Sequence, residues 1–326
     1  MAEFDLIGLI QQRVAARADV LLGIGDDAAL LRPPAGHELV VTADTLNAGV
    51  HFPVGTAAAD IGWKALAVNL SDLAAMGAQP AWCTLSLSLP QADAGWVEGF
   101  LDGFLALAGR HRIALVGGDT TRGPLSIGIT AMGHVESGAA LRRDRARVGD
   151  DIWVTGTLGD AAAALVLGGH LPAPPGFGAA VVSTAAQEAL LARLQRPTPR
   201  VEAGRALLGL ARACVDVSDG LLADLGHVCR RSGTGAEVWL PALPASAALR
   251  EVAGAAAPAL QAAGGDDYEL CFTAPQALGD ALRLALEQAG VEATRIGRIV
   301  AGSGVRALDA GGTPWQPGRA GYEHFG

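Results

Sequence analysis

The amino-acid sequence predicts an α+β fold with enough chain for two domains, and three observations indicate it. The 326 residues are about twice the usual length of one domain. Half of them are apolar and only 17% are charged, which excludes intrinsic disorder and allows a large buried core. Strand-like and helix-like segments alternate in both halves, and several strands read as antiparallel neighbours rather than as a doubly wound parallel sheet.

The elements follow from hydrophobic periodicity, taken in chain order. Short or alternating apolar runs predict strands at 38–42, 82–89, 113–116, 126–135, 152–154, 214–217, 236–240 and 269–273. The first of these runs leads directly to Asp44, where we expect the strand to end. Helical spacing predicts helices at 57–76, 96–108, 184–194, 200–213, 221–231 and 276–289. Residues 172–178 (PAPPGFG) are loop-like in composition. A charged stretch at 142–151 precedes a new strand, so we predict domains at 1–148 and 149–326.

Charge and residue usage exclude several classes of protein. The formal net charge of −9 makes nucleic acid or an anionic membrane a poor partner. One of the 24 basic residues is a lysine, Lys64, and no G-x-x-x-x-G-K-[ST] motif surrounds it, so the chain has no P-loop. The N-terminal segment carries acids where a signal peptide needs bases, and no apolar run approaches the ~18 residues of a membrane span. We therefore expect a cytoplasmic protein with four free thiols.

Familiar catalytic signatures are absent as well. The seven histidines are scattered with no H-E-x-x-H motif, which disfavours zinc, and no G-x-S-x-G elbow is present for a hydrolase triad. Gly23-x-Gly25-x-x-Ala28 matches a dinucleotide fingerprint. However, Asp26 and Asp27 within it would repel a pyrophosphate, and no helix is predicted to follow. We therefore exclude a Rossmann site.

The informative pattern is a set of five Asp-containing segments placed after strands or on one helix, at 23–27, 42–45, 69–72, 117–122 and 216–220. Aspartate is also an ordinary turn residue, so each segment alone fits a structural role. Two carboxylates at about 4 Å repel by roughly 4 kcal/mol at an effective dielectric of about 20. If the segments converge, several divalent cations must lie between them, and oxygen ligands of this kind suit Mg²⁺. Metal ions, rather than lysines, would then neutralise a polyphosphate. His51, in a Gly-containing loop shortly after Asp44, is a candidate substrate contact.

With these motifs assembled, the chain resembles the thiamine-monophosphate kinase family of the aminoimidazole-ribonucleotide-synthetase-like ATP-binding superfamily. The resemblance covers essentially the whole chain. It is carried by GIGDDAAL (23–30), TADTLNAGVHF (42–52), KALAVNLSDLAAMGAQPAW (64–82), GGDTTRGP (117–124), DVSDGLLADLGH (216–227), GGDDYELCF (264–272) and GYEHF (321–325). The last two segments point to the thiamine branch.

The resemblance implies two α+β domains of the superfamily type. The N-terminal domain would bind ATP and Mg²⁺ and form a homodimer through its sheet, and the C-terminal domain would complete the active site. The matching magnesium ligands are Asp27, Thr42, Ala43 (through its carbonyl), Asp44, Asp72, Asp119, Asp216 and Asp219. The matching nucleotide contacts are Gly118, Asp119, Arg143 and Ser218, and the matching thiamine monophosphate contacts are His51, Asp266 and Tyr322. We interpret Asp72, Asp119 and Asp216 as catalytic. The family commonly has Glu in place of Asp266, so this contact would be one methylene shorter.

The implied activity is direct transfer of the γ-phosphoryl group of ATP to thiamine monophosphate, with several Mg²⁺ ions. The acceptor phosphate, with a second pKa near ~6, is largely dianionic at neutral pH and needs no general base. Two alternatives stay open. One is another member of the superfamily, a synthetase of purine biosynthesis. The other is a metal-dependent phosphohydrolase, because the same carboxylates would serve two-metal hydrolysis.

Overall fold

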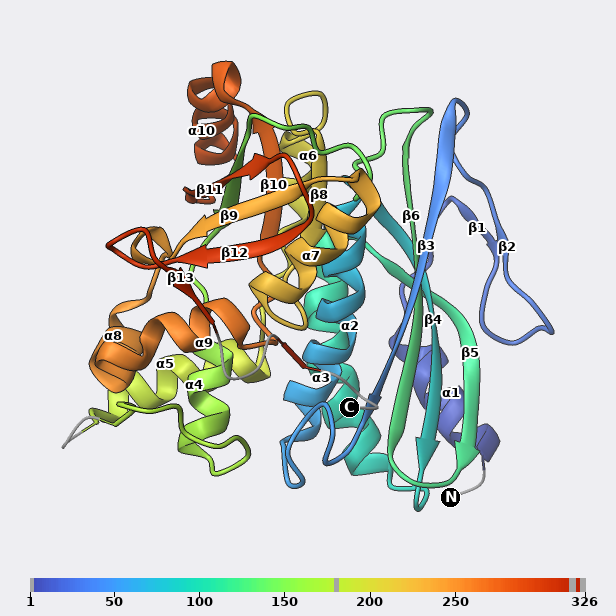
Figure 1. Ribbon diagram of the computed structural model, residues 1–326. Coiled ribbons are helices and arrows are strands. Elements are labelled where there is room, and N and C mark those ends of the chain that lie inside the picture. Colours follow the sequence, from blue (N-terminus) through green and yellow to red (C-terminus); the bar gives the residue numbers. More distant parts are fainter. Residues whose placement is uncertain (1–2, 179–181, 317–320, 323–326) are drawn as a thin grey trace. The chain divides into compact units, whose positions relative to one another are not determined.

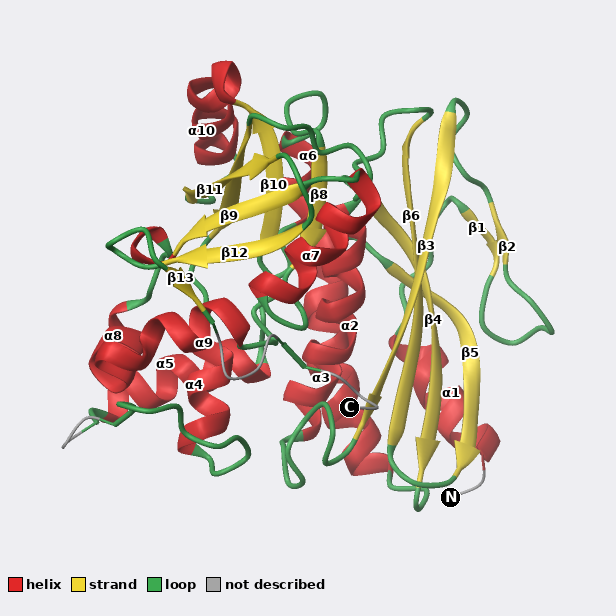
Figure 2. Ribbon diagram, viewed as in Figure 1, coloured by secondary structure: helices red, strands yellow, loops and turns green. Residues whose placement is uncertain are grey.

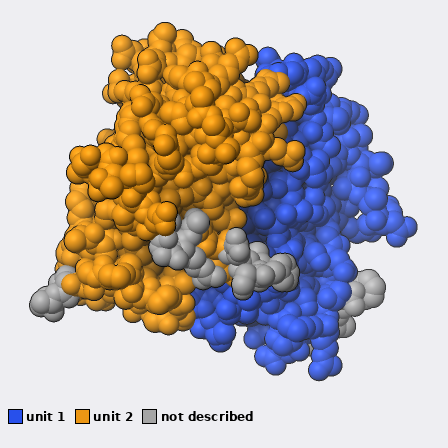
Figure 3. Space-filling model, viewed as in Figure 1, with its two compact units in different colours: residues 1–73, 78–139 blue, residues 74–77, 140–326 orange. Residues whose placement is uncertain are grey.

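The computed structural model describes residues 3–178, 182–316 and 321–322. The chain forms two compact units: unit 1 comprises residues 1–73 and 78–139, and unit 2 comprises 74–77 and 140–326 (Figure 3). Figures 1 and 2 show helices and mixed sheets in both, as the predicted α+β class requires.

Unit 1 is built on a four-stranded sheet with the strand order β3-β6-β4-β5. The strands are β3 (His37–Asn47), β4 (Gln79–Leu89), β5 (Ala114–Arg122) and β6 (Ser126–Glu136). The pair β4–β5 is parallel and the other two pairs are antiparallel. A separate hairpin joins β1 (Val20–Leu22) to β2 (Leu30–Leu31). A dinucleotide fingerprint at 23–28 would need a helix directly after it, but the strand β2 follows instead. The exclusion of a Rossmann site therefore agrees with the fold.

Three helices accompany the sheet of unit 1: α1 (Glu3–Arg13), α2 (Ala58–Ala75) and α3 (Ala94–His111). The backbones of α2 and α3 approach closely at two glycines. A Cβ on Gly62 would lie 2.0 Å from the Phe100 carbonyl oxygen, and one on Gly103 would lie 1.7 Å from that of Ala59. Only glycine therefore permits this packing. Every second residue of β6, from Ile127 to Val135, is buried, as expected for a sheet with one covered face.

Unit 2 is built on a seven-stranded sheet with the order β13-β12-β9-β11-β7-β10-β8, in which only β12–β9 is parallel. The strands are β7 (Asp150–Thr155), β8 (Ala213–Asp216), β9 (Gly235–Trp239), β10 (Leu270–Pro275), β11 (Ala293–Val300), β12 (Gly304–Leu308) and β13 (Pro314–Trp315). The core on this sheet joins Val154, Val215 and Val238 to Leu225 of the helix α7 (Leu221–Ser232).

The remaining helices of unit 2 form a second apolar cluster and short connections. The cluster joins α4 (Asp160–Leu167), α5 (Thr184–Gln195), α8 (Ala247–Ala253) and α9 (Ala257–Ala263). The others are α6 (Val201–Ala206), α10 (Gly279–Gln288) and the 3₁₀ turns Leu240–Ala242, Gly254–Ala256 and Gln276–Leu278.

Three sequence predictions were wrong in detail. The segments 42–45 and 117–122 were expected as turns after strands, but both lie inside strands, β3 and β5, because each is paired along its length with a neighbouring strand. The helix expected at 200–213 ends after Ala206. The chain then turns, with Gly209 at φ 77°, and enters β8. The four cysteines are free and buried, as expected.

Candidate active site

Strand β3 carries the first group of predicted metal ligands. Thr42 and Asp44 point to one face, where both are half-buried, while Ala43 between them is exposed on the other. Asp44 lies opposite Ile129 of β6, so the ladder fixes the position of its backbone. The side chain of Ala43 therefore points away from those of Thr42 and Asp44, which fits the expectation that it contributes only its carbonyl oxygen.

Helix α2 brings Asp72 to the same place. The Thr42 hydroxyl donates a hydrogen bond of 2.5 Å to Asp72 Oδ2, which joins residues 30 positions apart. One turn before Asp72, Asn69 is fully buried, and its Nδ2 donates to the Ala65 carbonyl. Asn69 Oδ1 accepts no hydrogen bond. A buried acceptor without a donor is costly, and a carboxamide oxygen is a magnesium ligand. The donor set here is therefore chemically suited to Mg²⁺.

Strand β5 and the 23–27 loop hold exposed carboxylates. Gly118 has φ 152°, and a Cβ there would lie 1.9 Å from the Leu85 carbonyl oxygen, so the backbone beside Asp119 requires glycine. Asp119 itself is exposed. In the loop, the Asp27 N–H donates to Asp26 Oδ1 at 2.8 Å. This bond gives Asp26 a local role in shaping the turn, and both of these aspartates are exposed.

The loop after β3 holds His51 in one tautomer. The Asn47 N–H donates to His51 Nδ1 at 3.0 Å, so a neutral His51 carries its proton on Nε2. Lys64 is 2% exposed, and its ammonium donates to the His51 carbonyl oxygen at 3.1 Å. The only lysine in the chain thus anchors the loop that carries the predicted substrate histidine.

In unit 2 the predicted residues begin at the end of β8. Asp216 is 3% exposed and lies 4.0 Å from the guanidinium of Arg143, which is itself exposed. Ser218 and Asp219 follow in a loop and are half-buried. Because Arg143 contacts a buried carboxylate and remains accessible, it can also contact an anionic ligand.

Asp224, which the sequence reading missed, organises this loop. Its Oδ2 accepts the N–H groups of Ser218 and Asp219 at 3.0 Å each and of Gly220 at 3.1 Å. Burial, reinforced by the Asp219 charge, raises the pKa of Asp224 to about 7, against the lowering by these three hydrogen bonds. The available signal was an acid in the first turn of a helix directly after DVSDG.

The GGDDYEL segment holds two residues in left-handed backbone conformations. Asp266 has φ 67° and Tyr268 has φ 51°, an unusual conformation for residues with side chains. The Tyr268 hydroxyl donates to Asp266 Oδ1 at 3.0 Å. Tyr322 is 41% exposed, and its N–H donates to the Asp219 carbonyl oxygen at 3.0 Å. Both predicted thiamine-side residues of unit 2 are therefore tied to neighbouring polar groups.

Behind that segment lies a buried charged cluster that the sequence reading also missed. Glu269 is fully buried and accepts two bonds of 2.6 Å from Arg200, one of 2.8 Å from Arg193 and one of 2.7 Å from the Thr155 hydroxyl. Beside it, the buried Asp267 accepts the Gly159 N–H. Burial raises the pKa of Asp267 well above its ordinary value. Nothing in the sequence around Glu269 and Asp267 distinguishes these buried acids from the exposed acids of the chain.

The predicted metal ligands thus divide into one set in each unit. Unit 1 holds Asp27, Thr42, Ala43, Asp44, Asp72 and Asp119, and unit 2 holds Asp216 and Asp219. The structure brings together Thr42 with Asp72 and Arg143 with Asp216. Within residues 3–178, 182–316 and 321–322, no three His, Cys, Asp or Glu side chains gather in a metal-binding group. No helix of this part of the chain is long and apolar enough to cross a membrane.

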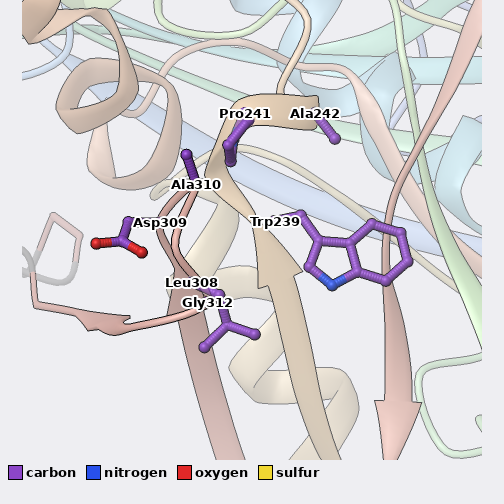
Figure 4. Close-up of a pocket in the computed structure, with 7 residues that line it drawn as sticks. All are labelled: Trp239, Pro241, Ala242, Leu308, Asp309, Ala310 and Gly312. Atoms are coloured by element: carbon purple, nitrogen blue, oxygen red, sulfur yellow. The ribbon is translucent and has the colours of Figure 1, made fainter.

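An open surface pocket of about 500 Å³ lies elsewhere in unit 2. Figure 4 shows its lining, which includes Trp239 at the end of β9 and Asp309 after β12. None of the predicted site residues lines it, so the pocket is separate from the candidate active site.

Two family models match the chain. The N-terminal domain of AIR synthase related proteins matches residues 25–135, and their C-terminal domain matches residues 147–309. Among curated proteins, the thiamine-monophosphate kinase of Salmonella typhimurium is 46% identical over 326 residues, covering 99% of this chain and 98% of the relative. The thiamine-monophosphate kinase of Haemophilus influenzae is 45% identical over 303 residues, covering 92% of this chain and 89% of the relative.

Solved structures agree. The crystal structure of thiamine-monophosphate kinase from Stenotrophomonas maltophilia superposes with a TM-score of 0.85 and 60% identity, covering 94% of this chain and 96% of that one. The structure of AaThiL complexed with AMPPCP and TMP superposes with a TM-score of 0.76 and 33% identity, covering 99% of this chain and 97% of that one. The resemblance drawn from the motifs is thereby confirmed. The chain belongs to the AIR synthase related proteins and, within them, to the thiamine-monophosphate kinase family.

Proposed function

We propose that this enzyme transfers the γ-phosphoryl group of ATP directly to thiamine monophosphate, giving thiamine diphosphate and ADP. One observation carries the proposal. The chain matches, over 99% of its length, a structure solved with an ATP analogue and TMP, at 33% identity. Curated relatives of nearly equal length carry the corresponding kinase name.

We assign phosphate and metal binding in unit 1 to its oxygen donors. The proposed Mg²⁺ ligands are Asp27, Thr42, the Ala43 carbonyl, Asp44, Asp72 and Asp119, and Gly118 with Asp119 would contact the nucleotide. The chain has a net charge of −9, so bound Mg²⁺ would supply the positive charge that neutralises the phosphates. The hydrogen bond from Thr42 would orient the Asp72 carboxylate.

In unit 2 we assign Asp216 and Asp219 as further metal ligands, and Arg143 and Ser218 as nucleotide contacts. Arg143 carries a permanent charge, so it would stabilise the negative charge that is distributed over the transferred group. Asp72, Asp119 and Asp216 are the residues we propose as catalytic. Catalysis would consist of positioning and charge stabilisation, because the acceptor is already an anion and requires no base.

Three residues would recognise thiamine monophosphate. The Nε2–H of His51 would donate to the acceptor phosphate, because Nδ1 already accepts the Asn47 N–H. Asp266 would accept from the aminopyrimidine amine, and the half-exposed Tyr322 ring would face the thiazolium cation. The Tyr268 hydroxyl, bonded to Asp266 Oδ1, would orient that carboxylate.

The test is chromatography of the nucleotides and thiamine phosphates after incubation of the enzyme with ATP, Mg²⁺ and thiamine monophosphate. We expect equal amounts of ADP and thiamine diphosphate, and no turnover in excess chelator. ADP and free phosphate formed without the acceptor would instead indicate a phosphohydrolase. Turnover only with a purine-biosynthesis substrate would indicate the synthetase alternative.

We further propose that the enzyme is a cytoplasmic homodimer, with domains at 1–148 and 149–326. Support for the dimer comes from β3, where Leu39 and Val41 are 54% and 55% exposed on one face of the sheet. Sedimentation at micromolar concentration should show a dimer, and Leu39→Asp with Val41→Asp should give monomers. Leu284→Asp, at a similarly exposed leucine of α10, is the control. A monomeric wild type would contradict the proposal.

A further inference from the structure

One oxygen atom of Asp224 fixes the loop 217–220, which lies between β8 and α7. Asp224 Oδ2 accepts the N–H groups of Ser218, Asp219 and Gly220 within 3.1 Å. Asp224 is 4% exposed, so its carboxylate is withdrawn from solvent and faces the loop. Three successive amides directed at one buried carboxylate leave the loop little conformational freedom.

The carbonyl oxygens of the same loop hold two other segments. The Val217 carbonyl accepts the Tyr268 N–H at 2.8 Å, and the Ser218 carbonyl accepts the Asp266 N–H at 2.8 Å. The Asp219 carbonyl accepts the Tyr322 N–H at 3.0 Å. The N–H groups of Ser218, Asp219 and Gly220 therefore bind Asp224, whereas that of Val217 donates to the Glu269 carbonyl oxygen at 2.8 Å. The carbonyls of the loop bind the two segments that carry the proposed thiamine contacts.

Close backbone approach supports this connection independently. A Cβ on Gly265 would lie 2.6 Å from the Ser218 carbonyl oxygen. A Cβ on Gly321 would lie 2.9 Å from the Asp219 carbonyl oxygen and 2.7 Å from Ala223 Cβ. The residues just before Asp266 and Tyr322 are thus glycines where the loop leaves no room for a side chain.

We propose that Asp224 is a positioning residue that, through the loop 217–220, sets Asp266 and Tyr322 for thiamine monophosphate and Ser218 and Asp219 for the nucleotide and metal. The inference rests on the proposed function for the roles of those four residues. The loop is the shared element, so loss of the carboxylate affects both substrates, whereas changes at Tyr322 or Ser218 each affect one.

The first experiment measures amide hydrogen exchange without substrates, in Asp224→Ala and in the more conservative Asp224→Asn. Asp309→Ala is the matched control, because Asp309 Oδ1 accepts two turn N–H groups at 2.8 Å in an exposed loop. We expect faster exchange in Asp224→Ala at 218–220, 266–268 and 322 together, an intermediate effect in Asp224→Asn, and none at these sites in the control. Faster exchange confined to 218–220 would overturn the inference. This readout does not depend on the reaction.

The second experiment measures steady-state kinetics of the same variants and of the double variant Asp224→Ala with Tyr322→Ala. We expect KM to rise about tenfold or more for both substrates in Asp224→Ala. The effect of Tyr322→Ala on KM for thiamine monophosphate should be smaller in that background than in wild type. Lower thermal stability with unchanged KM values, or fully multiplicative effects, would reduce Asp224 to a helix-terminal stabiliser. A wild type that makes no thiamine diphosphate would overturn the proposed function, while the exchange result would still decide the positioning role.

Discussion

The two units position their site residues by different means. In unit 1, six of the eight proposed site residues stand on strands or a helix, whose backbone hydrogen bonds fix them directly: Thr42, Ala43, Asp44, Asp72, Gly118 and Asp119; Asp27 and His51 lie in loops. In unit 2, five of the six proposed site residues stand outside helices and strands: Arg143, Ser218, Asp219, Asp266 and Tyr322. Two buried acids that are not proposed to bind substrate or metal lie near them: Asp224 accepts backbone N–H groups of the loop 217–220, and Glu269 pairs with Arg193 and Arg200.

This difference changes which mutations matter. A strand or helix resists the loss of one side chain because its backbone ladder remains. A loop held by a few buried carboxylates depends on each of them, because removal leaves unpaired N–H groups or unpaired charges. We therefore expect unit 2 to be sensitive at residues remote from the chemistry, and unit 1 to be sensitive mainly at the ligands themselves.

The largest expected effect is on stability, at Glu269. Glu269→Gln removes the anion that pairs with Arg200 and leaves Arg193 only Asp160, 3.8 Å away. The two arginine side chains are 18% and 22% exposed, so the loss should cost about 3–5 kcal/mol of unfolding free energy. Glu237→Gln is the control. Glu237 also pairs with two arginines, but the side chains of these arginines are 54% and 60% exposed, so we expect a loss of less than about 1 kcal/mol of unfolding free energy. Denaturant unfolding measures both. Equal losses would remove the contrast between buried and surface clusters.

The next effect is on activity, at the ligands of unit 1. Asp72→Asn removes the charge of a proposed metal ligand that stands on a helix, so kcat should fall more than about tenfold, at least about 1.4 kcal/mol, while the melting temperature stays near wild type. Asp216→Asn in unit 2 should lose as much activity. Asp102→Asn, at an exposed acid of α3, should leave kcat unchanged. More than a tenth of wild-type kcat in Asp72→Asn would make that residue structural.

A smaller effect should separate the two substrates. Tyr322→Ala removes the proposed aromatic face and should weaken thiamine monophosphate binding by roughly 0.5–2 kcal/mol, while KM for ATP hardly changes. Steady-state kinetics with each substrate varied in turn provides the internal control. Equal losses for both substrates would mean that the segment only supports the fold, and no loss would remove Tyr322 from the site.

The smallest effect is a pH dependence of stability from Asp267. Burial raises its pKa in the folded state above the ordinary 3.8, with Arg193 opposing and Asp160 and Glu269 reinforcing the shift. The folded state therefore binds more protons than the unfolded state above about pH 4, so this group lowers the unfolding free energy as pH rises from there through the folded-state pKa. Asp267→Asn should flatten that slope, whereas Asp280→Asn, at a fully exposed acid, should not. Unfolding curves at several pH values measure it, and parallel profiles would contradict the assignment.

Much of the fold could be predicted because the signals are local. The periodicity of 57–76 predicted a helix observed as Ala58–Ala75, and the alternation at 126–135 predicted a strand observed as Ser126–Glu136. Motif resemblance likewise identified the family. The roles of the site residues stay predictions.

The sequence by itself determined the α+β class, the main elements, the family and the candidate site residues, because residue type and spacing along the chain carry that information. Only the tertiary structure decided that Asp44 and Asp119 lie within strands, since their pairing partners are distant in the chain. It also decided that Glu269 is buried against Arg193 and Arg200, 76 and 69 residues away. The environment of a charged side chain depends on which remote segments pack around it, and an aspartate or glutamate reads the same in the sequence whether it is exposed or buried.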